Sequence, residues 1–290
     1  MRPQPTKENF AVLILTHGRA NNVATIATLQ KSGYTGRIVI VIDNEDAQAE
    51  DYYRNFGDQV VMFDKLAVAE YTDEGYHDHQ DRRSITYARN AAFTIAKDLG
   101  LQYFMMLDDD YVNFQYRFND KQQYCNSNIK NLDAVLDAML TFYVSINAHS
   151  IAFAQGGDFM GGGNGTFGKK VTLKRKCMNT FICDVDRPYL FRGVFNEDVN
   201  TYTTLSQQGC LFFTLTNVII NQKETQSNPG GITELYQKFG TYVKSFYTVM
   251  YSPSSVKIAM MNSSHSRIHH EVRWKNTAPK ILHQRHKKTQ

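Results

Sequence analysis

Three consecutive carboxylates, Asp108, Asp109 and Asp110, follow directly on the apolar run Tyr103 to Leu107. A short run that is apolar throughout is typical of a strand covered on both faces, and acids at its end lie at the carboxyl edge of an α/β sheet, where ligands bind. Adjacent anions repel one another, and a divalent cation, Mn²⁺ or Mg²⁺, offsets that cost. A solvated acidic turn is the alternative, but the preceding strand favours a metal site.

Acidic residues recur in two other places. Asp43 to Asp46 ends a second apolar run, and Glu197 and Asp198 lie in the polar turn Phe195 to Asn200. A divalent cation together with a separate carboxylate base suits nucleotidyl transfer, or glycosyl transfer from a nucleotide sugar, because the cation neutralises a diphosphate leaving group. The alternative for Glu197 and Asp198 is a helix N-terminus, which favours acids.

Histidines and cationic residues gather in the second half of the chain. His265, His269 and His270 could complete a metal site, and surface positions are the alternative. The net charge of +4 is concentrated in short clusters, which suit the phosphates of a polyanion but also solvated loops. These clusters are Lys169-Lys170, Lys174-Arg175-Lys176 and Arg285 to Lys288 in the tail 281–290.

Alternating strands and helices are needed to bring these residues together. The clearest helix is expected between Ser84, as N-cap, and Gly100, with Arg89 and Asn90 off its apolar stripe. The strand–helix–strand order predicts an α/β fold with a mostly parallel, Rossmann-like central sheet flanked by helices. Strands are expected at 10–16, 37–43, 59–64, 103–107, 150–154, 181–192 and 211–220, and further helices at 23–30 and 132–140.

Composition favours one soluble domain of 290 residues, with 42% apolar and 21% charged residues and no linker or repeat. No apolar run approaches the roughly 20 residues that span a bilayer, and no signal peptide is recognised, so we expect a cytoplasmic protein without a membrane partner. Four widely spaced cysteines without a CxxC pair indicate reduced thiols. The glycine-rich stretch 156–168 lacks the P-loop pattern.

The order of these segments resembles the GT-A type of nucleotide-sugar glycosyltransferase over about residues 9–220. The resemblance implies a nucleotide-sugar half at about 9–120 and an acceptor half at about 150–280. It rests on a first strand ending at Thr16-His17, a second ending at Asp43, a helix with Ala88-Arg89-Asn90 before the Asp108–Asp110 strand, and Glu197-Asp198 after Arg192-Gly193.

The GT-A resemblance also implies residue roles. Asp110 and Asp108 would bind the metal, with His265 or His269 as a late ligand to metal or phosphate. Asp198, or Glu197, would be the base of an inverting displacement. The donor nucleotide sugar would be contacted by Thr16, His17, Arg19, Asp43, Arg89, Asp108 and Asp109.

The C-terminal third is similar to the TET/JBP-associated glycosyltransferases. This resemblance implies a phage enzyme in the host cytoplasm that moves a sugar, glucose or arabinose being favoured, from a UDP-sugar to 5-hydroxymethylcytosine in double-stranded DNA. Lys169, Lys170, Lys174, Arg175 and Lys176 would then contact DNA phosphates. The similar blocks are 228–236, 240–246, 253–257, 267–270 and 274–280.

Two alternatives remain open at this point: a transferase of the same fold acting on protein or glycan, and a DNA-binding protein with an inactive transferase fold. Retention of Asp108, Asp110, Glu197 and Asp198 argues against the second, because an unused acidic cluster has an uncompensated folding cost. A nucleotidyltransferase is disfavoured because no glycine-rich phosphate loop follows the first strand.

Overall fold

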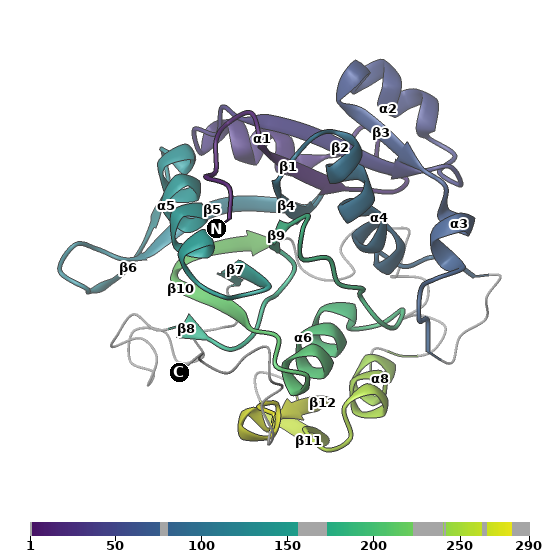
Figure 1. Ribbon diagram of the computed structural model, residues 1–290, viewed down its shortest axis with the longest axis vertical. Helices are drawn as coiled ribbons and strands as arrows, with labels where there is room; N and C mark the ends of the chain where they lie inside the picture. The colour runs from purple at the N-terminus through teal and green to yellow at the C-terminus, as the bar shows by residue number, and fades with distance from the viewer. Residues whose placement is uncertain are drawn as a thin grey trace.

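A computed structural model describes residues 2–75, 81–155, 173–222, 240, 242–262 and 266–279. Its main element is a mixed β-sheet in the order β3-β2-β1-β4-β9-β7-β10-β5-β6, with β8 paired to β10 (Figure 1). The strands are β1 Phe10–Leu15, β2 Arg37–Asp43, β3 Val60–Phe63, β4 Tyr103–Asp108, β5 Tyr111–Phe118, β6 Tyr124–Asn128, β7 Ser150–Gln155, β8 Leu173–Lys174, β9 Ile182–Asp184 and β10 Phe212–Gln222.

The N-terminal half of the sheet is parallel. Strand β1 pairs with β2 and with β4, so that Leu15 lies beside Val41 on one side and beside Asp108 on the other. The carboxyl ends of these strands therefore meet at one edge. Beyond β4 only the β7–β10 pair is parallel among the described strands, and β9, β5 and β6 pair antiparallel. The expected α/β architecture is confirmed, with a sheet that is mixed.

Two apolar layers cover the sheet, because alternate residues of each strand point to opposite faces. Val12 and Ile14 of β1 pack in one layer, and Leu13 and Leu15 pack in the other. Helices α1 (Ala24–Lys31), α2 (Ala49–Phe56) and α5 (Leu132–Ser145) contribute to the first layer. Helices α3 (Lys65–Ala69), α4 (Thr86–Asp98) and α6 (Glu197–Gln207) contribute to the second.

Helix α4 begins one residue later than the sequence predicted. Its N-cap is Ile85, one residue after the expected Ser84, but the Ser84 hydroxyl still accepts the amide of Thr86, the first helical residue, at 3.3 Å. The hydroxyl of Ser84 also donates to the carbonyl of Val194 at 3.0 Å, and that of Thr86 donates to Gly193 at 2.7 Å. The first turn of α4 is thereby tied to the segment that leads into α6.

The strand expected over 181–192 is much shorter in the structure. Strand β9 ends at Asp184, where a turn closes with a hydrogen bond of 3.0 Å from the Arg187 amide to the Asp184 carbonyl. Pro188 follows and has no amide proton for a sheet ladder. Beyond it, Tyr189 and Phe191 pack as a tilted ring pair with centroids 5.3 Å apart, and both lie in the core layer of α4.

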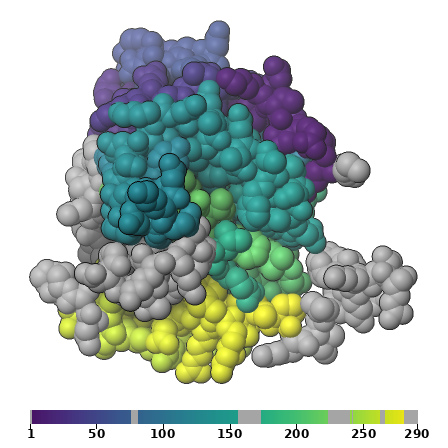
Figure 2. Space-filling model, turned by 90° about the vertical axis from the view of Figure 1, so that its left-hand side faces the viewer, coloured from purple at the N-terminus to yellow at the C-terminus, as the bar shows by residue number. Residues whose placement is uncertain are grey.

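A C-terminal unit that the sequence did not predict in this form packs against α6. It consists of helix α8 (Val243–Tyr251) and an antiparallel hairpin of β11 (Val256–Asn262) and β12 (Ser266–Val272), followed by the short helix η5 (Trp274–Asn276). Figures 1 and 2 show this unit at the opposite end of the molecule from α2 and β3.

In the described ranges, no helix has the length and apolar character needed to cross a membrane. All four cysteines are free, as expected.

Candidate active site

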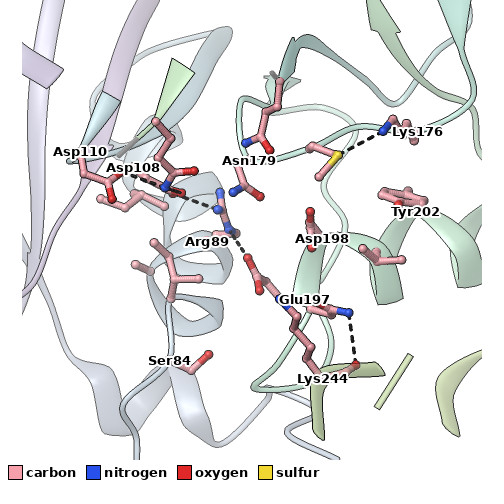
Figure 3. Close-up of a pocket in the computed structure, with 18 of the residues that line it drawn as sticks. Ser84, Arg89, Asp108, Asp110, Lys176, Asn179, Glu197, Asp198, Tyr202 and Lys244 are labelled. Carbon is pink, nitrogen blue, oxygen red and sulfur yellow. Dashed lines mark hydrogen bonds and ion pairs between the residues drawn. The ribbon is translucent and has the colours of Figure 1, made fainter. Parts of the chain in front are cut away.

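A pocket of about 820 Å³ opens at the carboxyl ends of β1, β2 and β4. Its wall continues across the start of α6 to α8 and the β11–β12 hairpin, so both halves of the chain line it (Figure 3). All predicted site residues in the described ranges except Lys174 and Arg175 line this pocket: Thr16, His17, Arg19, Asp43, Arg89, Asp108, Asp109, Asp110, Lys176, Glu197, Asp198 and His269.

His17 and Asp43 lie side by side at the ends of β1 and β2. The Nδ1 atom of His17 is 2.8 Å from Asp43 Oδ2, and the buried ammonium of Lys65 is 3.3 Å from Asp43 Oδ1. Burial raises the pKa of Asp43, but the His17 hydrogen bond and the Lys65 charge outweigh it and hold this pKa below its usual range. Asp43 therefore stays an anion, suited to accept hydrogen bonds from a base or a ribose.

Asp109 points away from its two neighbours and fixes the loop after β1. Its oxygens accept hydrogen bonds from the Thr16 hydroxyl at 2.6 Å and from Arg19 Nη1 at 2.6 Å. The Tyr52 hydroxyl lies 2.8 Å from Thr16 Oγ1 and accepts the Arg19 amide at 2.8 Å. Thr16, Arg19 and Asp109 thus form a connected group that positions the loop beside the pocket.

Asp108 and Asp110 both face the pocket and share one donor. The Gln222 amide nitrogen lies 2.8 Å from Asp110 Oδ1 and 3.5 Å from Asp108 Oδ2. Burial raises the pKa of both carboxyls, that of Asp108 to about 7 with further repulsion from Asp110, Glu197 and Asp109. The two carboxylates are hard oxygen donors whose charges repel, a set that suits Mg²⁺ or Mn²⁺ held partly by substrate phosphates.

The described residues do not form a complete protein metal cage. Within the parts of the chain that the structure describes, no three His, Cys, Asp or Glu side chains gather as a cation site. Of the two histidines expected as late ligands, His265 lies outside the described residues. His269 lines the pocket from β12, with its ring 4.2 Å from that of His270.

Arg89 connects the two acidic groups of the pocket. Its Nη2 atom is 2.9 Å from Asp108 and its Nε atom is 2.9 Å from Glu197 (Figure 3). The guanidinium is only 1% exposed, and it lies 5.4 Å and 5.7 Å from the ring centroids of Phe181 and Phe191. Burial disfavours the charge, but the two carboxylates outweigh it and raise the pKa of Arg89. Arg89 thereby binds the end of β4 to the start of α6.

Asp198 is the acid best placed to act as a base. Glu197 is engaged by Arg89, whereas no side-chain hydrogen bond from the described residues lowers the pKa of Asp198. Burial, followed by repulsion from Glu197, raises the pKa of Asp198 to about 7. A carboxylate with this pKa can take up a proton near neutral pH.

Asn196, the N-cap of α6, joins α6 to the C-terminal unit. It has a left-handed backbone (φ 54°), which asparagine tolerates better than most residues. Its amide nitrogen lies 3.2 Å from the Lys244 carbonyl, 3.0 Å from the Thr248 hydroxyl and 3.1 Å from His270 Nδ1. Burial, followed by the charge of His269, lowers the pKa of His270 to about 3, so His270 is neutral and accepts through Nδ1.

The predicted DNA-contacting cluster is divided in the structure. Lys176 lines the pocket, and its ammonium lies 3.4 Å from the sulfur of Met178. Arg175 donates to the carbonyl of Trp274 at 3.4 Å and to that of Thr277 at 3.5 Å. Lys174 belongs to β8, and Lys169 and Lys170 lie outside the described residues.

Sequence reasoning missed Lys65, Gln222 and Lys244 as pocket residues. The position of Lys65 could have been recognised in the sequence, since it comes shortly after the end of a strand at Phe63. Gln222 had no such signal, because its approach to Asp110 depends on the antiparallel pairing of β10 with β5, in which Gln222 lies opposite Tyr111.

The family model for TET-associated glycosyltransferases matches residues 10–231, and the chain belongs to this family. The family and the α/β fold expected from the sequence are thus confirmed. A search of curated proteins found no match.

Several solved structures are similar to this chain. The Pyrobaculum calidifontis mannosyltransferase PcManGT, in complex with GDP-Man and Mn²⁺, is 12% identical, with a TM-score of 0.46 over 85% of this chain and 65% of its own. S. aureus TarS (1-349) is 11% identical, with a TM-score of 0.42 over 84% and 65%. Glucosyl-3-phosphoglycerate synthase from Mycobacterium tuberculosis, with Mg²⁺ and UDP, is 7% identical, with a TM-score of 0.45 over 93% of each chain. The chain thus spans 65% of the length of the first two proteins.

Proposed function

We propose that this protein transfers a sugar from a UDP-sugar, glucose or arabinose being favoured, to the hydroxyl of 5-hydroxymethylcytosine in double-stranded DNA. The observation that carries the proposal is the position of Asp198, a buried acid with a pKa of about 7 that lines the same pocket as the Asp108–Asp110 pair. Membership of the TET-associated glycosyltransferase family supports the reaction class and directs the choice of acceptor.

The donor nucleotide is bound at the ends of β1 and β2. Asp43, kept anionic by His17 and Lys65, accepts hydrogen bonds from the nucleoside. Thr16, Arg19 and Asp109 hold the adjoining loop in place.

Asp108 and Asp110 would hold a divalent cation, Mn²⁺ or Mg²⁺, which when bound would supply positive charge to the diphosphate leaving group. The amide of Gln222 orients both carboxylates. The guanidinium of Arg89 balances the negative charge of Asp108. The Nη1 atom of Arg89 has no hydrogen-bond partner among the described residues.

The acceptor hydroxyl is a poor nucleophile and needs a base. Asp198 takes the hydroxyl proton as the oxygen attacks the anomeric carbon and the bond from that carbon to the diphosphate oxygen breaks. Because the pocket is recessed, the target nucleotide leaves the base stack to reach it.

The test is an incubation read by nucleoside mass spectrometry. Purified protein, Mn²⁺ or Mg²⁺ and a panel of UDP-sugars are mixed with duplex DNA containing either cytosine or 5-hydroxymethylcytosine. We expect a hexose or pentose mass gain on hydroxymethylcytosine alone. Slow metal-dependent hydrolysis of a UDP-sugar without any gain on DNA would reject the DNA acceptor and direct the search to protein and glycan acceptors.

A further inference from the structure

Cationic side chains from three separate segments gather on the wall of the pocket that the C-terminal unit forms. Lys244 reaches it from α8, His269 from β12, and Lys176 from the segment after β8. Arg267 is not among the residues that line the pocket, but it lies on β12 two residues before His269. These four residues are called the cationic wall here. Lys244 and His269 are half-buried, whereas Arg267 is exposed.

Lys244, Arg267 and His269 of the cationic wall are close enough to repel one another. Burial lowers the pKa of Lys244, and the charge of Arg267 lowers it further, while the nearby Asp198 acts in the opposite direction. Burial also lowers the pKa of His269, followed by the charges of Arg267 and Lys244. Gathering like charges in a half-buried position costs folding free energy, and a bound anion offsets that cost.

Three members of the cationic wall, Lys244, Arg267 and His269, lie on regular elements. Cross-strand pairing sets Arg267 opposite Met261 and His269 opposite Ala259. On α8, the Lys244 carbonyl lies 3.2 Å from the amide nitrogen of Asn196, the residue before Glu197 and Asp198. The cations are therefore fixed relative to the proposed base, as a preorganised ligand site requires.

We infer that Lys176, Lys244, Arg267 and His269 bind a backbone phosphate of the acceptor strand next to the target nucleotide. This inference rests on the proposed DNA acceptor. Phosphate is the shared chemistry of the acceptor backbone and of the donor diphosphate. The acceptor is favoured because the cationic wall comes from α8, β12 and the segment after β8. The donor-side acids Asp108 and Asp110 lie instead at the end of β4.

The cationic wall also bears on the expected role of His269. A divalent metal beside Lys244 and Arg267 would be repelled, whereas a phosphate would be attracted. His269 is therefore assigned to the anion rather than to the metal.

The experiment measures the salt dependence of binding to a fluorescent duplex, from about 50 to 200 mM salt, for the wild type, Arg267→Gln and Lys244→Gln. The matched control is Lys257→Gln, whose exposed lysine lies on the same hairpin and pairs with Glu271 at 3.1 Å. Each of the two wall variants is expected to reduce the slope of log K against log salt by about one unit, the value for one lost phosphate contact. The control and all UDP affinities, measured by calorimetry, are expected to stay at wild-type values.

Slopes that stay at the wild-type value in both wall variants, while the wild type glycosylates hydroxymethylated DNA, overturn the inference and leave the proposed function standing. A loss of UDP affinity in Lys244→Gln with an unchanged DNA slope overturns it in favour of the donor diphosphate. A wild type that binds DNA with the expected slopes but transfers no sugar to it supports the phosphate site and rejects the proposed reaction.

Discussion

At the scale of single residues, the site separates two neighbouring acids into different tasks. Glu197 accepts the Nε proton of Arg89 at 2.9 Å and is held as a structural partner. Asp198 carries the raised pKa and faces the pocket (Figure 3). Adjacent carboxylates in different surroundings can take different roles because each surrounding sets its own proton affinity.

The first prediction concerns Asp198. Asp198→Asn keeps the shape of the side chain but removes the proton acceptor, so kcat should fall by at least about 10²-fold, the low end for a general base. The Kd for UDP should not change, because the donor contacts lie at β1, β2 and β4. Steady-state kinetics and calorimetry check both values. If Glu197→Gln is the inactive variant and Asp198→Asn retains its rate, Glu197 is the base.

A pH profile tests the same assignment independently. Asp198 works as a base only when it is deprotonated, and its pKa is about 7. Below that pH, kcat/KM should fall by about tenfold for each pH unit, and above it the rate should level off. At saturating Mn²⁺, which would keep the Asp108 carboxyl ionised although its pKa without metal is also about 7, the profile of Asp198→Asn should lack this limb. A wild-type rate that is constant between pH 5.5 and pH 8 would exclude Asp198 as the titrating base.

Asp110 carries the third prediction. Asp110→Asn removes one of the two carboxylates proposed for the cation, so Mn²⁺ should no longer strengthen UDP binding, and metal-dependent turnover should disappear. Calorimetry of UDP with and without Mn²⁺ gives the measurement. Full activity of this variant in the presence of EDTA would contradict the metal assignment.

At the scale of elements, Arg89 is the link between α4, β4 and α6. Arg89→Met leaves Asp108 and Glu197 buried without their partner, and such a loss typically costs about 3–5 kcal/mol. Urea unfolding at pH 8 measures it. The control is Arg54→Met, which removes an exposed pair with Asp51 at 2.6 Å and should cost well under about 1 kcal/mol. Equal losses of unfolding free energy in the two variants would mean that the ion pairs of Arg89 contribute no more to stability than an exposed pair.

The sequence correctly predicted the elements whose formation depends mainly on the local pattern of apolar residues. The apolar runs predicted β1, β2 and β4, and the structure brings Asp43, at the end of β2, and Asp108 to Asp110, at the end of β4, to one pocket. The β11–β12 hairpin was missed because its strands mix exposed and half-buried residues without a regular alternation and include cations such as Lys257 and Arg267. Its contribution to the pocket depends on packing against α8, which local pattern does not encode.

At the scale of the whole molecule, the pocket is completed by elements from distant parts of the chain. The parallel strands supply the donor-side acids, and α6 supplies the proposed base. The C-terminal unit, which lies beyond the residues matched by the family model, supplies Lys244, Arg267 and His269 of the cationic wall. The proposed donor and acceptor sides thus come from different parts of one sheet-centred fold, and Asn196 joins α6 to the C-terminal unit through three close polar contacts.

The last prediction separates these two sides. Asn196→Gly keeps the left-handed backbone but removes the amide that joins α6 to α8 and β12, whereas Asn196→Ala also adds a backbone strain of about 1–2 kcal/mol. Both variants should raise the KM for DNA and leave the Kd for UDP unchanged, and only Asn196→Ala should show the added loss in urea unfolding. An equal loss of affinity for UDP and for DNA would contradict this division, because it would mean that the contacts of Asn196 support the donor side as well. A KM for DNA that is unchanged in Asn196→Gly would mean that the packing of α8 against β11 and β12 positions the cationic wall without the Asn196 amide.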